Sequence, residues 1–471
     1  MKKSVWKKTK RQKELKLINK TKEEILKENS MKDSIKEGSF ASVMRGAGDT
    51  YITPFALAIG ANSFQIGLIK SLTGLLAPFA QLKGSKLMEK YSRKRVIITF
   101  VALQALMWFP IIFLAVLFLQ GNFLIQLPYL LIILYILYAV FGALASPAWF
   151  SLMGDIVPNN TRGRYFSKRS RITSFVTLII TLGAAFVLDY FKTKGIALVG
   201  FSIIFSIAGI CRLYSAKLFK NHYEPKLKLE KGYYFSFFNF LKTGLKTNFG
   251  KFALFVALFY FVSNIAGPFF AVYMLKDLGF SYINYMILTI SSTIAGLLFL
   301  PFWGKISDKY GNRVTLLISS IIIPFFPFLW LFFKTPYLLI IPQAISGLAW
   351  AGFSLSASNF IYDSVSVNRR GLCVAYYNIL IGIGIFIGAL IGGAVIQYIP
   401  ITFMNIFLFI FLVSAILRAL VVLVFIKKIK EERKVTKATP VLIAKDFARM
   451  EGIMQDIGVV KKFFFRKKKS T

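Results

Sequence analysis

Long apolar runs separated by short polar loops make up most of the chain. The stretch from Ile97 to Leu119, for example, is 23 residues long and contains a single amide side chain, Gln104. A helix needs about 20 predominantly apolar residues to cross a hydrocarbon core about 30 Å thick. The pattern therefore predicts an all-α multi-pass membrane protein with twelve membrane-spanning helices. The expected spans are residues 38–60, 65–83, 96–119, 127–150, 168–191, 196–219, 251–275, 283–303, 313–333, 336–358, 372–398 and 402–426.

The composition agrees with this prediction. Hydrophobic residues make up 56% of the chain and charged residues only 17%, whereas about a quarter of a soluble domain is charged. An ordinary soluble enzyme is therefore not expected. The net charge of +39 fits a nucleic-acid binder or a membrane protein with a basic inner surface. Because the bases gather in loops and in the two tails, residues 1–37 and 427–471, we expect no nucleic-acid partner.

The loops between the expected spans differ sharply in charge. The loops after the second, fourth, sixth, eighth and tenth spans, together with the adjoining ends of those spans, contain 24 basic residues, and the alternate loops contain only Lys192, Lys194, Lys276 and Lys334. Short loops rich in Lys and Arg stay in the cytoplasm. We therefore expect a protein of the cell membrane with both termini cytoplasmic. The basic tails then face the inner leaflet, whose anionic lipids are expected partners.

The longest internal connection divides the expected spans six and six, and three pairs of matching segments occur in the same order on either side of it. Such repetition indicates an internal duplication. The pairs are Thr53-Pro54-Phe55 with Gly267-Pro268-Phe269, Glu89–Lys94 with Asp308–Arg313, and Asp155 and Arg162 with Asp363 and Arg370. We predict a basic N-terminal tail, a six-helix half, a central cytoplasmic loop, a second six-helix half and a basic C-terminal tail. These regions are residues 1–37, 38–219, 220–250, 251–426 and 427–471.

The stretch from Gly304 to Arg313 resembles the signature that the major facilitator superfamily carries between its second and third spans. The copy in the first half is weaker, since Ser85, Glu89 and Ser92 depart from the pattern. The resemblance covers residues 38–426 and implies a transporter that works by alternating access. It also implies that the signature residues latch the two halves together on the cytoplasmic side, although the bases also fit a role in orientation alone. The gate candidates are Glu89, Lys90, Lys94, Asp155, Arg162, Asp308, Lys309, Arg313, Asp363 and Arg370.

Asp49 is the one acidic residue well inside an expected span, and it lies four residues after Arg45 and four before Thr53. On an uninterrupted helix this spacing places the three side chains on one face. Two interpretations are open. In the first, Asp49 takes up a proton or binds a cationic or hydroxylated substrate; in the second, Arg45 and Asp49 form a permanent ion pair that lets the helix insert. Arg45 is also the best-placed base for an anionic substrate group.

Other polar and aromatic residues lie on spans that are expected to line a central cavity. A polar group at membrane depth tends to face a cavity or a partner, whereas an aromatic residue at helical spacing also fits ordinary packing. Arg212 and Arg418 lie near cytoplasmic ends, from which their side chains can extend to the headgroups. The remaining cavity candidates are Lys70, Gln104, Trp149, Asn264, Trp350 and Asn359.

Sequence signals for other chemistry are missing. The chain has no G-x-x-x-x-G-K-S/T phosphate loop, its single histidine, His222, falls in the central loop, and Cys211 and Cys373 are isolated. We therefore expect no catalytic residues, no metal site and no cofactor.

The favoured function is secondary active transport of a small organic solute. Protons acting through Asp49 are the favoured coupling ion, and uniport stays open. A lipophilic drug, an anion and a sugar are all open as substrates. The alternative function is that of a non-transporting membrane receptor or scaffold with a transporter-like fold.

Overall fold

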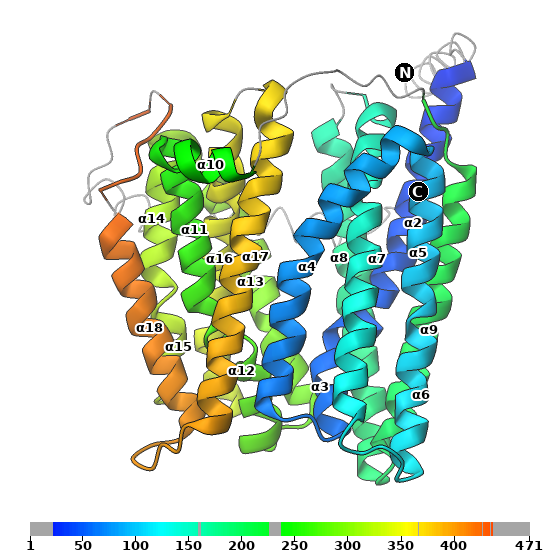
Figure 1. Cartoon of the computed structure of the whole chain (residues 1–471), viewed down its shortest axis with the longest axis vertical. Helices are drawn as coiled ribbons and strands as arrows, with labels where there is room; N and C mark the ends of the chain where they lie inside the picture. Colours follow the sequence, from blue (N-terminus) through cyan, green and yellow to red (C-terminus); the bar gives the residue numbers. More distant parts are fainter. Residues whose placement is uncertain are drawn as a thin grey trace, which may run out of the picture. The chain divides into compact units, whose positions relative to one another are not determined.

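The computed structural model describes residues 22–158, 162–225, 237–365, 367–425, 427–433 and 435–436. Within these residues the chain is helical and contains no β-strand (Figure 1). Ten helical segments of the described chain are long and apolar enough to cross a membrane, and they confirm the prediction of an all-α multi-pass membrane protein. The ten segments are Arg93–Leu119, Leu127–Ile156, Arg164–Thr193, Ala197–Asn221, Asn248–Asp277, Tyr282–Tyr310, Asn312–Leu329, Pro336–Ile361, Cys373–Tyr398 and Ile406–Phe425.

The first two expected spans are not among these ten segments. The first is interrupted, because α2 (Lys22–Ala47) is followed by the 3-10 helix η1 (Asp49–Tyr51) and then by α3 (Ile52–Ala58). The second lies in α4 (Ser63–Lys90), which carries several lysines and polar side chains and contains no stretch as apolar as those of the ten segments. The count of twelve spans therefore stays a prediction.

Contacts between Cα atoms divide the chain into two compact units. The larger unit contains residues 1–234, 260–287 and 375–410. Its segments 260–287 and 375–410 come from the second expected half, so the units do not coincide with a six-plus-six division of the sequence. Besides α2, α3 and α4, this unit contains α5 (Arg93–Leu106), α6 (Trp108–Leu119), α7 (Leu127–Ile156), α8 (Arg162–Thr193), α9 (Ala197–Leu218), α12 (Phe269–Val272) and most of α17 (Val367–Tyr398).

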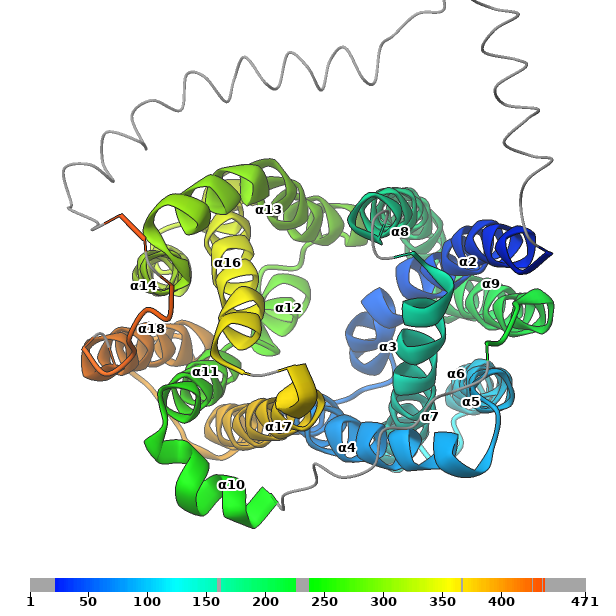
Figure 2. The same ribbon diagram turned by 90° about the horizontal axis from the view of Figure 1, so that it is seen from above.

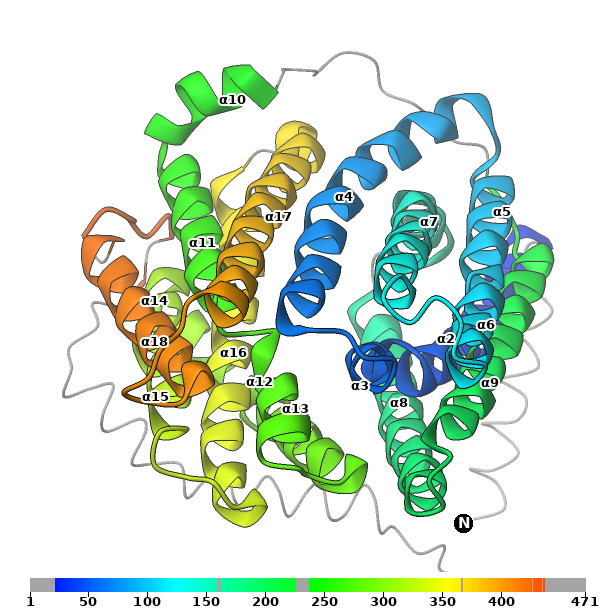
Figure 3. The ribbon, with the colours of Figure 1, turned by 60° about the horizontal axis from the view of Figure 1, so that its bottom comes forward.

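Small residues let the helices of the larger unit approach closely. α2 packs against α8 and α9 (Figure 2), where a Cβ added at Gly46 would lie 2.9 Å from the carbonyl oxygen of Thr177. α4 lies beside α17 (Figure 3), where a Cβ added at Gly382 would lie 2.5 Å from the carbonyl oxygen of Gly74. In lipid, close packing of this kind stabilises helix pairs in place of the hydrophobic effect.

The smaller unit contains residues 235–259, 288–374 and 411–471. Aromatic rings fill its core, as in the stacked pair Phe259 and Phe353, whose centroids are 4.9 Å apart. Its described helices are α10 (Phe237–Thr243), the first part of α11 (Asn248–Asn264), most of α13 (Tyr282–Tyr310), α14 (Asn312–Ile322), α15 (Phe325–Leu329), α16 (Pro336–Ser364) and most of α18 (Ile406–Phe425).

Candidate functional site

The break in the first span lies next to Asp49. α2 ends at Ala47, and η1 begins at Asp49 after Gly48, whose φ and ψ are −107° and −77°. A Cβ added at Gly48 would lie 2.4 Å from the ring of Trp108, so the close approach of this ring requires glycine. Interrupted helices often form binding sites in transporters, because they free backbone groups and redirect side chains.

Asp49 and Arg45 take different partners on the two sides of this break. The hydroxyl of Tyr138 on α7 donates a hydrogen bond to Asp49 Oδ1 at 2.5 Å. Arg45 Nη2 instead donates to Ser42 Oγ at 2.8 Å. The two residues form no ion pair in the described chain, so the permanent pair of the second interpretation is not formed there. The single helical face expected for Arg45, Asp49 and Thr53 is also absent, because the helix is interrupted between them.

A cavity of about 430 Å³ lies inside the larger unit, lined by residues of α2, α5, α7, α8 and α9. Its charged lining residues are Glu37, Arg45, Arg169 and Arg212. Trp149 also lines it, and the guanidinium carbon of Arg169 lies 4.6 Å from the centroid of the Trp149 ring. This distance is within the range of a cation–π interaction.

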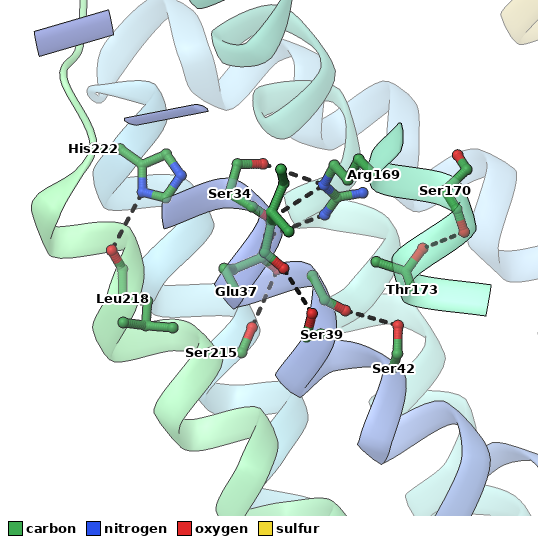
Figure 4. A network of polar contacts seen from close by, with 12 residues as sticks. Ser34, Glu37, Ser39, Ser42, Arg169, Ser170, Thr173, Ser215, Leu218 and His222 are labelled. Atoms are coloured by element: carbon green, nitrogen blue, oxygen red, sulfur yellow. Dashed lines mark hydrogen bonds and ion pairs between the residues drawn. The ribbon is translucent and has the colours of Figure 1, made fainter. Parts of the chain in front are cut away.

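Glu37 is the centre of a buried polar network beside this cavity (Figure 4). Its side chain is 3% exposed and accepts a hydrogen bond from Arg169 Nη2 at 3.1 Å. Ser215 on α9 donates to the other carboxylate oxygen at 3.2 Å, and Arg212 Nη1 lies 3.8 Å from it. Arg212 also donates from Nε and Nη2 to Gln104 Oε1 at 3.0 and 2.8 Å. The network joins α2, α5, α8 and α9 and holds two guanidinium groups at the cavity wall.

Three of the predicted cavity residues meet here. Arg45 and Trp149 line the cavity, and Gln104 binds Arg212 at its wall. Arg212 was expected to extend towards the headgroups but is directed inward, where Glu37 and Gln104 satisfy its charge and its donors.

The other predicted cavity residues lie elsewhere. Thr53 is on α3, and Lys70 is exposed on α4. Asn264 Nδ2 donates to the carbonyl oxygen of Tyr260 at 2.8 Å. Trp350 and Asn359 are on α16 in the smaller unit, where the Trp350 ring packs against Phe353.

Several residues of the site were not identified from the sequence. Glu37 was assigned to the tail because charged residues precede it, and Arg169 was counted among the bases that orient a loop. Tyr138 is one of 21 tyrosines and has no distinguishing neighbour in the sequence. Its role follows only from the folded contact with Asp49, which lies 89 positions away.

The gate candidates in the first half make contacts inside the larger unit. The fully buried Arg93, next to the candidate Lys94, donates from Nη1 to Asp155 Oδ2 at 2.6 Å. Lys94 Nζ donates to the carbonyl oxygen of His222 at 3.0 Å, and Lys90 is exposed. The side chains of Glu89 and Arg162 lie outside the described part of the chain.

The second copy of this motif makes equivalent contacts in the smaller unit. Asn312, which occupies the position of Arg93, donates to Asp363 Oδ2 at 2.6 Å. Arg433 also pairs with Asp363 at 3.2 Å, and Arg313 Nε donates to the carbonyl oxygen of Ile429 at 2.6 Å.

The remaining gate candidates of the second half are Asp308, Lys309 and Arg370. Asp308 and Lys309 are exposed, and the side chain of Arg370 is outside the described residues. A latch between the two halves stays a prediction.

A further polar contact in the larger unit joins α8 to the start of α13. Asp189 near the end of α8 accepts hydrogen bonds from the backbone N–H groups of Tyr282 and Ile283 at 2.7 and 2.8 Å. The Nζ of Lys192 lies 5.1 Å from the centroid of the Tyr282 ring. A carboxylate at the N-terminus of a helix satisfies free N–H groups and interacts favourably with the helix dipole.

The family model of the Major Facilitator Superfamily matches residues 38–246 and 252–468. The chain belongs to this superfamily. The resemblance of the Gly304–Arg313 segment is therefore confirmed at the level of the family. The class B tetracycline resistance protein of Escherichia coli is 31% identical over 97 residues, which are 21% of this chain and 24% of that protein. The curated relatives that the chain matches are covered over only 18% to 24% of their own length.

Solved structures of major facilitator transporters share the fold. The nucleoside transporter NupG aligns with a TM-score of 0.63 and 17% identity, over 84% of this chain and 98% of that chain. A D-xylose–proton symporter aligns with a TM-score of 0.63 and 14% identity, over 86% of this chain and 98% of that chain. This superfamily member therefore has the architecture of a membrane transporter.

Proposed function

We propose that this chain is a secondary active transporter that moves a small organic solute by alternating access and is driven by protons that bind Asp49. The observation that carries the proposal is the hydrogen bond between Asp49 and Tyr138 at the break in the first span. A carboxylate that has no permanent cationic partner at this depth can change its charge during a transport cycle. A D-xylose–proton symporter has the same fold, which supports proton coupling in this architecture.

The surroundings of Asp49 suit a group that gains and loses a proton. The cationic groups that interact electrostatically with Asp49 are Arg45 on α2 and Arg212 on α9. Two tyrosines of α7, Tyr138 and Tyr135, also lie next to it. The Tyr138 hydroxyl also lies 3.3 Å from Met44 Sδ, a second acceptor. When Asp49 is ionised, the hydroxyl donates to it. When Asp49 is protonated, the hydroxyl can accept from the carboxyl and donate to sulfur, so both states keep hydrogen bonds.

The test is solute flux into proteoliposomes with and without an inward proton gradient, using sugars, nucleosides, amino acids, organic acids and lipophilic drugs. We expect Asp49→Asn to reduce gradient-driven accumulation by about tenfold or more, while exchange of solute without a gradient persists. Tyr138→Phe should weaken accumulation as well, because it removes the donor to Asp49. Tyr135→Phe is the matched control, since Tyr135 stacks on Tyr138 but makes no hydrogen bond in the described chain.

Two results would contradict the proposal. Full gradient-driven accumulation by Asp49→Asn would remove Asp49 from the coupling mechanism. Absence of flux for every solute in a folded preparation would favour the receptor or scaffold alternative.

A further inference from the structure

The cavity of the larger unit has an excess of fixed positive charge. Arg45, Arg169 and Arg212 line it, and Glu37 is the single carboxylate among the described lining residues. Glu37 is shared between Arg169 and Arg212, at 3.1 and 3.8 Å, so it offsets about one of the three charges. Because uncompensated charge at membrane depth is costly, such a lining favours an anion as its occupant.

Arg45 is the base that is available to this occupant. Its side chain is exposed on the cavity wall, donates to Ser42 Oγ, and forms no ion pair in the described chain. A guanidinium presents several N–H donors in a planar fork that matches the oxygens of a carboxylate or phosphate. The bond to Ser42 uses one of these donors and leaves the others for a ligand.

A second cavity in the same unit, of about 380 Å³, independently carries positive charge. Lys192 and Lys276 line it together with Tyr282, and no carboxylate is among its described lining residues. These two lysines are half of the four bases in the loops predicted to lie outside the cell. An anion would therefore meet fixed positive charge in both cavities.

We propose that the transported solute is a compact organic acid whose carboxylate or phosphate group binds Arg45. This inference rests on the transport function proposed above and names its substrate class. A cation would be repelled by the excess positive charge of the lining, and a neutral sugar would leave that excess uncompensated. The cavity volume of about 430 Å³ restricts the solute to a small molecule.

The position of Asp49 links this anion to the proton. Ionised Asp49 partly offsets the positive potential at Arg45, and a proton on Asp49 removes that offset. Binding of the anion and binding of the proton therefore favour each other, and each raises the affinity for the other by the same factor. The expected mode of transport is symport of an acid with a proton.

The test measures binding to the purified full-length protein in detergent, without any gradient. The probes are matched pairs of an acid and a neutral analogue: glycerol 3-phosphate with glycerol, glucuronate with glucose, and lactate with lactamide. Binding is followed by tryptophan fluorescence and by the thermal unfolding midpoint. We expect at least one acid to bind while its neutral partner does not, and the affinity to fall as salt is added. The phosphate and carboxylate pairs distinguish the two kinds of acidic group.

Three variants locate the binding group. Arg45→Gln should weaken binding of the acid by about tenfold or more, since a charge-assisted hydrogen bond is lost. Arg45→Lys, which keeps the charge but not the fork, should weaken it less. Arg171→Gln is the matched control, because Arg171 is exposed on α8 and does not line the cavity. It should bind the acid as the unmodified protein does.

The results separate this inference from the proposed function. The inference is overturned if no acid binds, if the neutral analogues bind as well as the acids, or if Arg45→Gln binds the acid unchanged in a folded preparation. If acids bind through Arg45 but Asp49→Asn still accumulates solute in a proton gradient, the coupling proposal fails and the substrate class stands. If a neutral solute accumulates in an Asp49-dependent manner and no acid binds, the coupling proposal stands and the proposed substrate class fails.

Discussion

Arg45 and Asp49 lie four residues apart, yet each binds a different neighbour. The cause is Gly48, which lacks a side chain and lets the Trp108 ring occupy the space where a Cβ would lie. The helix ends there, and Asp49 turns to Tyr138 while Arg45 remains on the cavity wall. A base and an acid that would neutralise each other on a straight helix are thus both left for ligands.

His222 gives a prediction that depends on pH. Its ring is 2% exposed, and burial lowers the pKa of this histidine below its usual 6.5, although Glu37 and Asp33 oppose the shift. The unfolded chain therefore binds more protons than the folded chain as the pH falls through 6.5. We expect the thermal unfolding midpoint in detergent to decrease as the pH is lowered from above 6.5 to below it.

The control for this prediction is His222→Gln. Because His222 is the single histidine of the chain, the variant should lose the part of the decrease that begins near the histidine's ordinary pKa. An equal decrease in the two proteins would assign the effect to other groups.

Single residues could be predicted from the sequence only where their surroundings made them exceptional. Asp49 was found because an acid in an apolar run is costly, and Arg45 because of its spacing from Asp49. Glu37 could not be found, since α2 continues without a break from the charged tail into the membrane, and the sequence does not show which turn becomes buried. Tyr138 requires knowledge of how α7 packs against the first span.

At the scale of helices, the contact between α8 and α13 is a candidate for a gate. Asp189 receives two backbone N–H groups of the start of α13, so one side chain on an early span holds an element from the second expected half. Asp189 and the first turn of α13 both lie in the larger unit. The sequence predicted the two helices but not this contact, because an acid near a helix end is an ordinary feature.

Asp189→Asn should weaken this contact, since an amide oxygen is a poorer acceptor than a carboxylate and does not interact as well with the helix dipole. We expect the substitution to weaken this contact by about 1 to 2 kcal/mol, and the cavity beside it to open correspondingly more often. The measurement is the rate at which an impermeant maleimide labels Ala58→Cys, after Cys211 and Cys373 have been replaced by serine. Ala58 lines the cavity next to this contact.

Asp277→Asn is the matched control. Its carboxylate accepts a hydrogen bond from Asn405 at 2.6 Å, and both residues come from the second expected half. The labelling rate should not change in this variant. A rate that stays constant in Asp189→Asn as well would show that this contact does not restrict opening.

At the scale of the whole molecule, the two copies of the internal duplication contain the same kind of contact between a buried donor and an acid. Arg93 with Asp155 in the larger unit and Asn312 with Asp363 in the smaller unit occupy matching positions of the repeat. In each case a fully buried donor at the start of one helix binds an acid near the end of another. The sequence predicted the repeat and the two acids, but it did not single out the donors, because Arg93 and Asn312 differ in type.

This difference predicts unequal consequences for the two acids. Asp155→Asn leaves the fully buried cation of Arg93 with the carbonyl oxygen of Pro225 and with the more distant Glu224. Asp363→Asn leaves the neutral amide of Asn312 and the partly exposed Arg433, which still donates to the carbonyl oxygen of Ser307. We expect the free energy of unfolding to fall by about 1 to 3 kcal/mol in Asp155→Asn and by less in Asp363→Asn. Thermal unfolding of both variants measures the difference, and equal losses would contradict it.

The separation of Arg45 from Asp49 also has an electrical consequence. If a monovalent acid and a proton cross together, the two charges cancel and no net charge moves through the membrane. The membrane voltage would then do no work on the transported pair, and the pH difference alone would set the extent of accumulation. A cell could therefore load or expel such a solute even when its membrane is depolarised.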